Sequence, residues 1–535
     1  MNRWFENLVV YQIYPMSFKD SNHDGMGDIV GIMEKLDYLK TLGIDVLWLS
    51  PIYQSPMDDN GYDISDYYKI HPMFGTLEQF KKLLFEVHKR GMYLIMDLVV
   101  NHTSDEHVWF QEALKDETSP YRDFYIFRKH EEADFNMRSI FSGSAWEKTD
   151  DAYAYFHMFS KKQPDLNWKN EALRHAIYKM MNYWLDLGID GFRMDVIDLI
   201  GKDIDQHIFS NGPKLHDYLK EMHAHCFEGR QTITVGETGS VTPEIAIEYT
   251  SLGAHELDMV FQFQQVSLDE EKGKDKWHLK PLKLTDLKRV LSTWQTELYQ
   301  KGWNSLYWSN HDQPRIVSRW GNDQKFRIQS AKMLAGILHM MQGTPYIYQG
   351  EEIGMTNKHF TLKEELRDIE TINMIKEKED SWPLEKIFES IRAKGRDNAR
   401  TPMQWDTSMH AGFSDAHPWI DVNPNYLDIN VKQAIEDQNS IYHFYKELIN
   451  LRKQIRCVID GKYILKNPDD EQFFHFIREN EDESIEVIAN FSETEGSYET
   501  PTDKEVLMSN YDLLEPLFKP YELRIYYKKK GEDHA

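Results

Sequence analysis

Seven polar side chains stand at or just beyond the ends of short apolar segments, where the chain is predicted to pass from a strand into a loop. They comprise carboxylates that can act as nucleophile, acid or base, histidines that can bind hydroxyl groups, and an arginine that can hold an anion. One ionised and one protonated carboxyl group are what cleavage of a glycosidic bond requires. The seven residues are Asp97, His102, Arg193, Asp195, Glu237, His311 and Asp312.

A carboxylate at the end of a single strand most often caps the following helix, so no one member of the set identifies a site. Several acids that converge with histidine and arginine are harder to explain as caps. The set contains no grouping of Cys and His that suits zinc. Acid–base chemistry on a sugar, among many aromatic residues, is therefore the first hypothesis.

The elements that would position these residues alternate between two patterns. Eight short apolar segments are predicted strands: Val9–Pro15, Asp45–Ser50, Tyr93–Val99, Asp190–Asp195, Thr232–Gly236, Leu257–Gln262, Ser305–Ser309 and Pro345–Tyr348. Helical periodicity separates them, for example over Ile32–Leu42, Leu77–Arg90, Ala172–Leu187 and Arg327–Met341. Gly43, Gly91 and Gly188 are expected to end helices in a left-handed conformation.

This alternation predicts an α/β fold, a (β/α)8 TIM barrel whose active residues lie at the C-terminal ends of the strands. A doubly wound sheet is the alternative, but it would need a glycine-rich phosphate turn after the first strand, which the sequence lacks. The long aromatic stretch after the third strand predicts a small inserted domain, and the short β-type runs after Ser440–Ile455 predict a C-terminal antiparallel β domain. The expected boundaries are 1–102 and 168–460 for the barrel, 103–167 for the insertion and 461–535 for the last domain.

Composition narrows the range of partners. The 535 residues carry a formal net charge of −26, which disfavours binding to nucleic acid and to anionic lipid. There are two cysteines, no apolar segment long enough to span a membrane, and no signal-peptide pattern in MNRWFENLVVYQIYP. We expect a cytoplasmic monomer that acts on a small oligosaccharide.

Several strings around these residues resemble a known enzyme family. DLVVNHTS, GFRMDVIDLI, VGET and NHDQPR resemble the four signature regions of the α-amylase superfamily, glycoside hydrolase family 13. QPDLNW, DDNGYDISDY and RDNARTPMQW are similar to motifs of its oligo-1,6-glucosidase branch. The resemblance extends over nearly the whole chain and is strongest to bacterial dextran glucosidases, also called glucan 1,6-α-glucosidases.

The resemblance implies a role for each matching residue. Asp195 matches the nucleophile, Glu237 the acid/base and Asp312 the third acid that holds sugar hydroxyls. Arg193 would keep Asp195 ionised, and a less polar setting would keep Glu237 protonated. His102 and His311 resemble hydroxyl-binding histidines. A retaining mechanism would need the carboxyl groups of Asp195 and Glu237 about 5–5.5 Å apart.

Further positions bear on how substrates are selected. Asp59 and Arg400 match an Asp–Arg pair that grips the 4-hydroxyl of the terminal sugar and blocks longer chains, with Tyr62 as a stacking ring. Val196 resembles the valine of α-1,6-specific members. Lys276 resembles a lysine that contacts the acceptor-side sugar, although it also reads as one charge in the solvated run EEKGKDK.

One position departs from the family pattern. Dextran glucosidases carry Trp where this chain has Gly239, which favours short isomalto-oligosaccharides over long dextran.

The segment DSNHDGMGD places oxygen ligands at alternate positions, with Gly25 at a sharp turn. It resembles a calcium loop, although it is not an EF-hand, because its twelfth position is Gly31. We expect a structural Ca²⁺ held by residues matching Asp20, Asn22, Asp24, Met26 and Asp28, and no catalytic cofactor. The other interpretation is an Asx-rich turn without an ion.

The sequence thus predicts an exo-acting, retaining α-glucosidase that removes glucose from α-1,6-linked isomalto-oligosaccharides or dextran. The alternatives within the family are a trehalose-6-phosphate hydrolase and a sucrose isomerase or transglucosidase, which would share the catalytic acids. A non-catalytic relative of amino-acid transporter heavy chains is disfavoured, because the three acids are present and no membrane segment is found.

Overall fold

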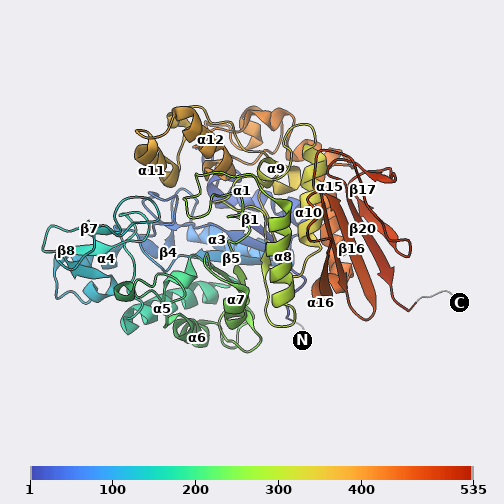
Figure 1. Cartoon of the computed structure of the whole chain (residues 1–535). Helices are drawn as coiled ribbons and strands as arrows, with labels where there is room; N and C mark the ends of the chain where they lie inside the picture. Colours follow the sequence, from blue (N-terminus) through green and yellow to red (C-terminus); the bar gives the residue numbers. More distant parts are fainter. Residues whose placement is uncertain (1–2, 532–535) are drawn as a thin grey trace.

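The computed structural model describes residues 3–531 of the chain. Eight parallel strands form one sheet in the order β11-β10-β9-β5-β2-β1-β13-β12, and a parallel bridge between Val260 and Asn304 joins its two ends. The sheet is therefore a closed barrel, as predicted (Figure 1). Its strands are β1 (Val10–Ile13), β2 (Val46–Leu49), β5 (Tyr93–Leu98), β9 (Gly191–Met194), β10 (Ile233–Glu237), β11 (Met259–Phe261), β12 (Ser305–Leu306) and β13 (Thr344–Tyr348).

Helices surround the barrel because each presents an apolar face to the strands. The principal ones are α1 (Ile29–Glu34), α2 (Leu36–Leu42), α3 (Leu77–Lys89), α5 (Glu171–Leu187), α6 (Leu215–Cys226), α7 (Pro243–Thr250), α8 (Leu284–Glu297), α10 (Arg327–His339) and α15 (Ile441–Gln454). Local signals set their ends: Thr76 and Gln79 form a capping box on α3, and Gly188 ends α5 at φ 107°. The helix predicted over Ile32–Leu42 is instead two helices, since the Lys35 amide turns back to the carbonyls of Ile32 and Met33.

The barrel interior is packed with large side chains rather than hollow. Trp48 and Phe261 lie with their rings 5.6 Å apart, and Phe261 and Tyr346 lie 4.6 Å apart. Because side chains fill the interior, an active site is expected at the mouth of the barrel, at the C-terminal ends of the strands.

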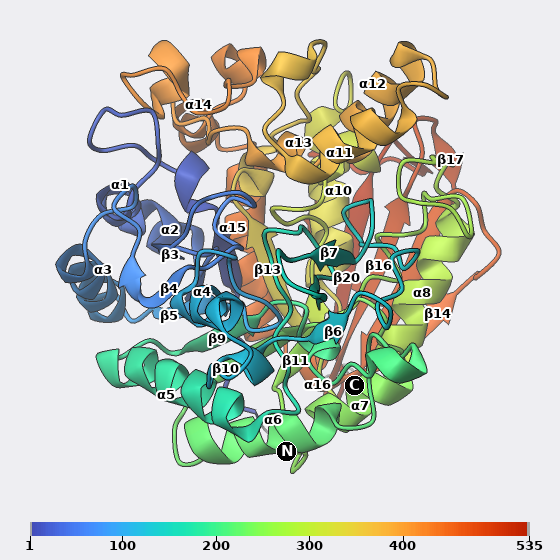
Figure 2. The ribbon, with the colours of Figure 1, turned by 90° about the vertical axis from the view of Figure 1, so that its left-hand side faces the viewer.

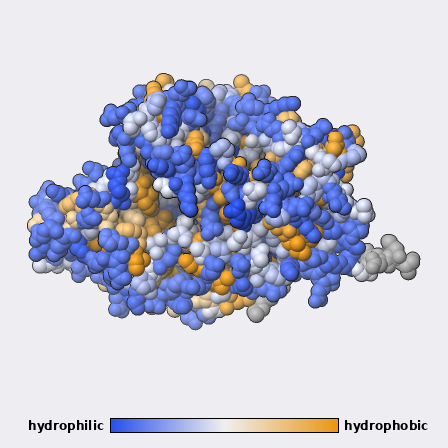
Figure 3. Space-filling view, viewed as in Figure 1, coloured by the Kyte–Doolittle hydropathy of each residue, from blue (hydrophilic) through white to orange (hydrophobic). Residues whose placement is uncertain are grey.

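Two lobes lie over that mouth (Figure 2). One contains α4 (Val108–Lys115) and a three-stranded antiparallel sheet of β6 (Phe127–Lys129), β7 (Trp146–Lys148) and β8 (Tyr153–Phe156). The other contains α11 (Ile369–Lys378), α12 (Leu384–Lys394) and α13 (Asp397–Arg400). Between the two lobes, hydrophobic residues gather on an otherwise mainly hydrophilic face (Figure 3).

A five-stranded antiparallel sheet in the order β14-β15-β16-β20-β18 follows the last barrel helix, as predicted. Its strands are β14 (Lys462–Lys466), β15 (Phe473–Glu479), β16 (Glu483–Asn490), β18 (Glu505–Ser509) and β20 (Leu523–Lys529). Gly336 of α10 allows close contact with this sheet, because a Cβ there would lie 2.0 Å from Leu523. The outermost positions of the predicted domain ranges, 1–2 and 532–535, lie outside the described residues.

Within residues 3–531, none of the helices combines the length and hydrophobicity that a membrane span requires.

Gly191 of β9 yields a test of barrel packing. Its φ is +145°, and a Cβ would lie 1.9 Å from the carbonyl oxygen of Ile233 on β10. Gly191→Ala should therefore destabilise the protein by about 3 kcal/mol, through both strain and overpacking. Gly253→Ala is the matched control, since φ is +86° there but nothing lies within 4 Å, and should cost only about 1 kcal/mol. Equal melting temperatures for the two variants would contradict the packing argument.

Candidate active site

Arg193 lies at the centre of the site, 1% exposed, and contacts three carboxylates. Its Nη1 is 2.7 Å from Oδ1 of both Asp97 and Asp195, and its Nη2 is 2.7 Å from Oε2 of Glu237. The strand register explains this convergence: Asp97 of β5 lies opposite Arg193 of β9, and Arg193 lies opposite Val235, two residues before Glu237. Three adjacent strands thus bring the predicted acids together.

One guanidinium shared by three buried acids cannot neutralise them all. Burial raises the pKa of Asp195 well above its usual range, and this effect outweighs the lowering by Arg193. Burial likewise raises the pKa of Asp97 to about 6. The pKa values of Asp195 and Asp97 are therefore both raised even though the two carboxyl groups share a cation. The sequence-based expectation that Arg193 alone would favour the ionised form of Asp195 is incomplete, because Asp97 and Glu237 compete for the same cation.

Val196 links the two predicted catalytic acids through its backbone. It adopts a left-handed conformation, with φ 37° and ψ 42°, that β-branched residues rarely occupy. Its N–H donates to Oε2 of Glu237 at 3.1 Å. Strained backbone of this kind persists where surrounding contacts enforce it, often at functional sites. Here the strain orients the amide that follows Asp195 toward Glu237.

Aromatic and histidine side chains form the wall beside these acids. The Tyr62 ring stacks on His311 with 5.1 Å between centroids, and its hydroxyl donates to Oδ2 of Asp97 at 3.0 Å. His102 Nε2 lies 2.9 Å from the Tyr62 carbonyl oxygen. Burial lowers the pKa of His102 to about 4 and that of His311 to about 3. Both rings are therefore neutral at pH 7 and can exchange hydrogen bonds with hydroxyl groups.

Arg396 and Arg400 form a second arginine centre, around Asp312. Arg400 Nη2 is 2.8 Å from Oδ1 of Asp312, whereas Asp59 pairs with Arg396 at 3.1 Å and accepts from Gln163 Nε2 at 3.0 Å. The direct partner of Asp59 is thus Arg396 rather than Arg400, whose guanidinium is engaged by Asp312 and by the His311 carbonyl oxygen. Burial would raise the pKa of Asp312, but neighbouring cations, Arg396 and Arg400 among them, hold it well below its usual range.

Lys276 lies at the rim, apart from the acids. Its Nζ is 2.5 Å from Oε2 of Glu370, and the same oxygen is 3.4 Å from Nε of Arg396. It also lines a cavity of about 310 Å³ together with Arg138, Trp277 and Glu370. The structure therefore connects Lys276 to the site through one intervening carboxylate.

The predicted calcium loop lies between β1 and α1. Asp20 accepts from the backbone of Asn22, His23 and Gly25, Asp24 accepts from the amide of Met26, and Asp28 caps α1 through Gly31 N–H. Over residues 3–531, three or more His, Cys, Asp or Glu side chains placed to hold a metal ion were not found together. The all-oxygen donor set suits calcium, but the loop carboxylates face backbone amides rather than one shared point.

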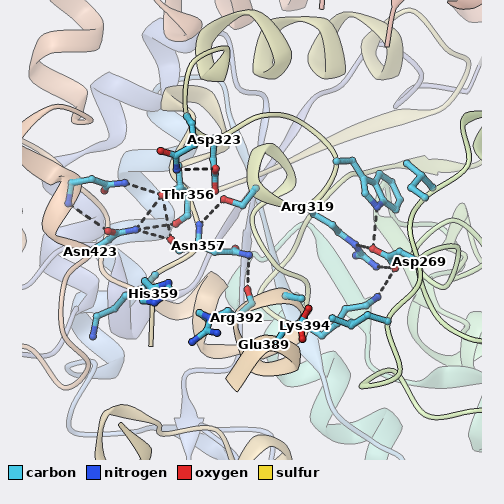
Figure 4. A pocket seen from close by; sticks show the side chains of 18 of the residues that line it. Asp269, Arg319, Asp323, Thr356, Asn357, His359, Glu389, Arg392, Lys394 and Asn423 are labelled. Atoms are coloured by element: carbon cyan, nitrogen blue, oxygen red, sulfur yellow. Dashed lines mark hydrogen bonds and ion pairs between the residues drawn. The ribbon is translucent and has the colours of Figure 1, made fainter. Parts of the chain in front are cut away.

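A larger cavity of about 790 Å³ lies away from the acids (Figure 4). Several of its polar groups already have partners: Asp269 binds Arg319 at 2.7 Å and Lys394 at 2.6 Å, and the side chain of Asn423 donates to Thr356. Asp195, Glu237 and Asp312 do not line it. Size alone therefore does not identify the site.

Sequence reasoning assigned no role to four residues of the site: Asp97, Gln163, Arg396 and Asp368. Gln163 and Arg396 stand inside the quoted strings QPDLNW and RDNARTPMQW, where the spacing of two arginines four residues apart was a usable signal. Asp97 lies opposite Arg193 only through strand pairing. Asp368 carries no sequence signal of a role at the site, because its ion-pair partner Arg396 lies 28 residues away along the chain.

Comparisons with known proteins agree with this geometry. Residues 12–461 match the model of the alpha amylase catalytic domain. The chain is 52% identical to an oligo-1,6-glucosidase of Parageobacillus thermoglucosidasius, covering 98% of each chain, and 54% identical to a glucan 1,6-alpha-glucosidase of Streptococcus pneumoniae, covering 92% of each.

Solved structures show how closely the fold is shared. The chain superimposes with a TM-score of 0.94 on a trehalose-6-phosphate hydrolase of Bacillus licheniformis, at 47% identity, covering 99% of this chain and 100% of that one. An isomaltulose synthase of Klebsiella sp. LX3 gives the same TM-score at 36% identity, covering 98% and 99%. With its acids gathered at the mouth of an eight-stranded barrel, the chain belongs to the α-amylase family of glycoside hydrolases, family 13.

Proposed function

We propose that the protein is an exo-acting, retaining α-glucosidase that hydrolyses α-1,6 bonds at the non-reducing end of isomalto-oligosaccharides and releases glucose. The observation that carries the proposal is the contact of one guanidinium with both Asp195 and Glu237 at 2.7 Å. Two carboxyl groups on neighbouring nitrogens of one arginine favour the short separation that a covalent intermediate requires, rather than the wider gap that admits a water molecule.

In the proposed mechanism Asp195 attacks the anomeric carbon while Glu237 donates a proton to the leaving glycosidic oxygen. A covalent glucosyl ester forms on Asp195. Glu237, now ionised, takes a proton from water, and the water oxygen then displaces Asp195 with a second inversion. Asp312, kept ionised by Arg396 and Arg400, would accept hydrogen bonds from sugar hydroxyls as the ring distorts.

Exo-action requires one end of the site to be closed. Asp59, 4% exposed, and the guanidinium groups of Arg396 and Arg400 stand at that end, with Tyr62 stacked on His311 beside them. Charged groups in fixed positions suit recognition of a terminal hydroxyl. A glucose unit that carried a further substituent there would lose those hydrogen bonds.

The α-1,6 preference rests on several supports. Two relatives above 50% identity are named for α-1,6 substrates. Val196 lies beside the acid/base, and Lys276 with Glu370 offers polar groups to the acceptor sugar. Gly239 itself offers no ring to stack on an acceptor sugar, and a Cβ there would meet only the Phe263 ring, at 3.5 Å. The proposal therefore favours short oligosaccharides.

A substrate panel tests the proposal. Isomaltotriose and p-nitrophenyl α-glucoside should be hydrolysed, with glucose first appearing as the α-anomer, and trehalose-6-phosphate should be a poor substrate. Glu237→Gln, expected to lower kcat on isomaltotriose by about 10³-fold, controls for contaminating activity. Activity confined to trehalose-6-phosphate, or conversion of sucrose without hydrolysis, would assign the protein to one of its other relatives.

The raised pKa of Asp195 predicts a pH effect. Asp195 must be ionised to attack, so kcat/KM should fall as pH drops through its raised pKa. Asp97→Asn removes a neighbouring negative charge, which should lower the pKa of Asp195 and move the acidic limb down by about one pH unit. Tyr62→Phe removes a hydrogen bond to Asp97 but no charge, and should slow the enzyme without moving the limb. An acidic limb that stays in place in Asp97→Asn would contradict the shared-charge model.

We also propose that the loop of Asp20, Asn22, Asp24, Met26 and Asp28 binds a structural Ca²⁺. The support is its oxygen donors at alternate positions and the turn at Gly25, where φ is +88° and a Cβ would lie 2.2 Å from the His417 carbonyl oxygen. Binding would require the carboxylates to turn from backbone amides toward the ion.

Metal removal tests the calcium proposal. Treatment with EDTA should lower the melting temperature, and Ca²⁺ at about 100 times its Kd should restore about 2.7 kcal/mol of stability. Asp24→Ala should abolish the response to Ca²⁺, whereas Asp415→Ala, which removes an exposed acid near the loop, should leave the response intact. A melting temperature insensitive to EDTA would mean that the loop is an Asx-rich turn only.

A further inference from the structure

We propose that Asp368 is a positioning residue of the donor-sugar site: by holding Arg396, it fixes the groups that recognise the 4-hydroxyl of the terminal glucose. The inference rests on the proposed α-glucosidase function and deepens it. Asp368 lies at the start of α11, which stands beside α13 above the barrel mouth (Figure 2).

Arg396 makes its closest side-chain contacts with Asp368. Asp368 is fully buried, and its Oδ1 lies 2.6 Å from Nη2 and 2.8 Å from Nε of Arg396. The same guanidinium reaches Asp59 at 3.1 Å and Asp312 at 3.4 Å. The two shortest contacts of Arg396 are thus with an acid outside the predicted sugar-binding set. Without Asp368, the guanidinium would be free to move closer to Asp59 or Asp312.

Asp368 is itself held in place, so it can act as an anchor. As the N-cap of α11, it accepts from the backbone N–H of Glu370 at 3.2 Å and of Thr371 at 3.0 Å. The Thr371 hydroxyl donates to Oδ2 at 2.6 Å. Its own amide donates to Oδ2 of Asp397 at 3.1 Å. These bonds leave the Asp368 carboxylate little freedom to follow Arg396.

Capping alone does not explain a carboxylate at this position. Asparagine caps helices about as well as aspartate, and Asn170 and Asn430 cap α5 and α14 (Val431–Glu436) in this chain. A buried charge is costly unless it is paired, and only an ionised side chain can pair with Arg396. An aspartate at position 368 therefore both pairs with Arg396 and caps α11.

The first turn of α11 also contacts Lys276, at the side of the site where the acceptor sugar is proposed to bind. Glu370 lies two residues after Asp368, and its Oε2 contacts Lys276 Nζ at 2.5 Å and Arg396 Nε at 3.4 Å. The first turn of α11 therefore joins the terminal-sugar end of the site to its rim. A shift of Arg396 would therefore alter its contacts at the terminal-sugar end and its contact with Glu370 at the rim.

The experiment compares p-nitrophenyl α-glucoside with its 4-deoxy analogue. Wild type should prefer the 4-hydroxyl substrate in kcat/KM by at least about 100-fold. Asp368→Asn keeps the helix cap but not the charge, and should reduce this preference by about tenfold, with a melting temperature close to that of wild type. Asn170→Ala is the control for a lost helix cap, since it removes the N-cap of α5 and leaves the ion pairs of Arg396 untouched. It should lower the melting temperature and retain the wild-type preference.

An unchanged preference in folded Asp368→Asn would overturn the inference and reduce Asp368 to a structural cap. If that variant does not fold, Arg396→Lys provides the same readout: loss of the preference supports the inference, and its retention overturns it. A wild type that does not discriminate also overturns it, whereas release of glucose from isomaltotriose would still support the proposed function separately.

Discussion

The shared guanidinium of Arg193 is the interaction on which the rest of the site depends. It binds acids from β5 and β10 and the residue that ends its own strand, so the barrel must close with its strands in register for the charges to meet. In a low-dielectric interior one cation cannot satisfy three anions. Burial and the repulsion between neighbouring carboxylates therefore raise the pKa of Asp195 and of Asp97 despite the shared cation.

A second centre repeats this design. Arg396 also contacts several acids, the buried Asp59 and Asp368 and the half-buried Asp312, but these come from loops and a helix start rather than from paired strands. The first centre is fixed by backbone hydrogen bonds of the sheet, and the second by helix caps and loop packing. The chemical step and the recognition of the sugar are thus supported by different parts of the fold.

One centre is fixed by strand register and the other by helix caps and loops. This difference explains which features could be predicted from the sequence. All eight strands were found because buried parallel strands are short apolar runs, and the proximity of Arg193 and Asp195 follows from the two-residue period of a strand. The partner of Asp59 was not found, because the choice between Arg396 and Arg400 depends on how α13 is oriented. Asp368 was not found either, since its contact with Arg396 spans 28 residues and leaves no periodic pattern. The calcium site, the monomeric state and the cytoplasmic location stay predictions.

The same division between barrel strands and surrounding loops explains why relatives named for different activities share one fold. A TM-score of 0.94 to an isomaltulose synthase at 36% identity shows that the scaffold hardly changes when the named product does. A glucosyl ester on the nucleophile can be released to water or to another hydroxyl, and access of water at the rim decides between them. The rim here is formed by Gly239, by the Lys276–Glu370 pair and by the cavity of about 310 Å³, with no strand among them. Differences in linkage and product are therefore expected in segments that can vary without disturbing the Arg193 centre, although Glu370 also contacts Arg396.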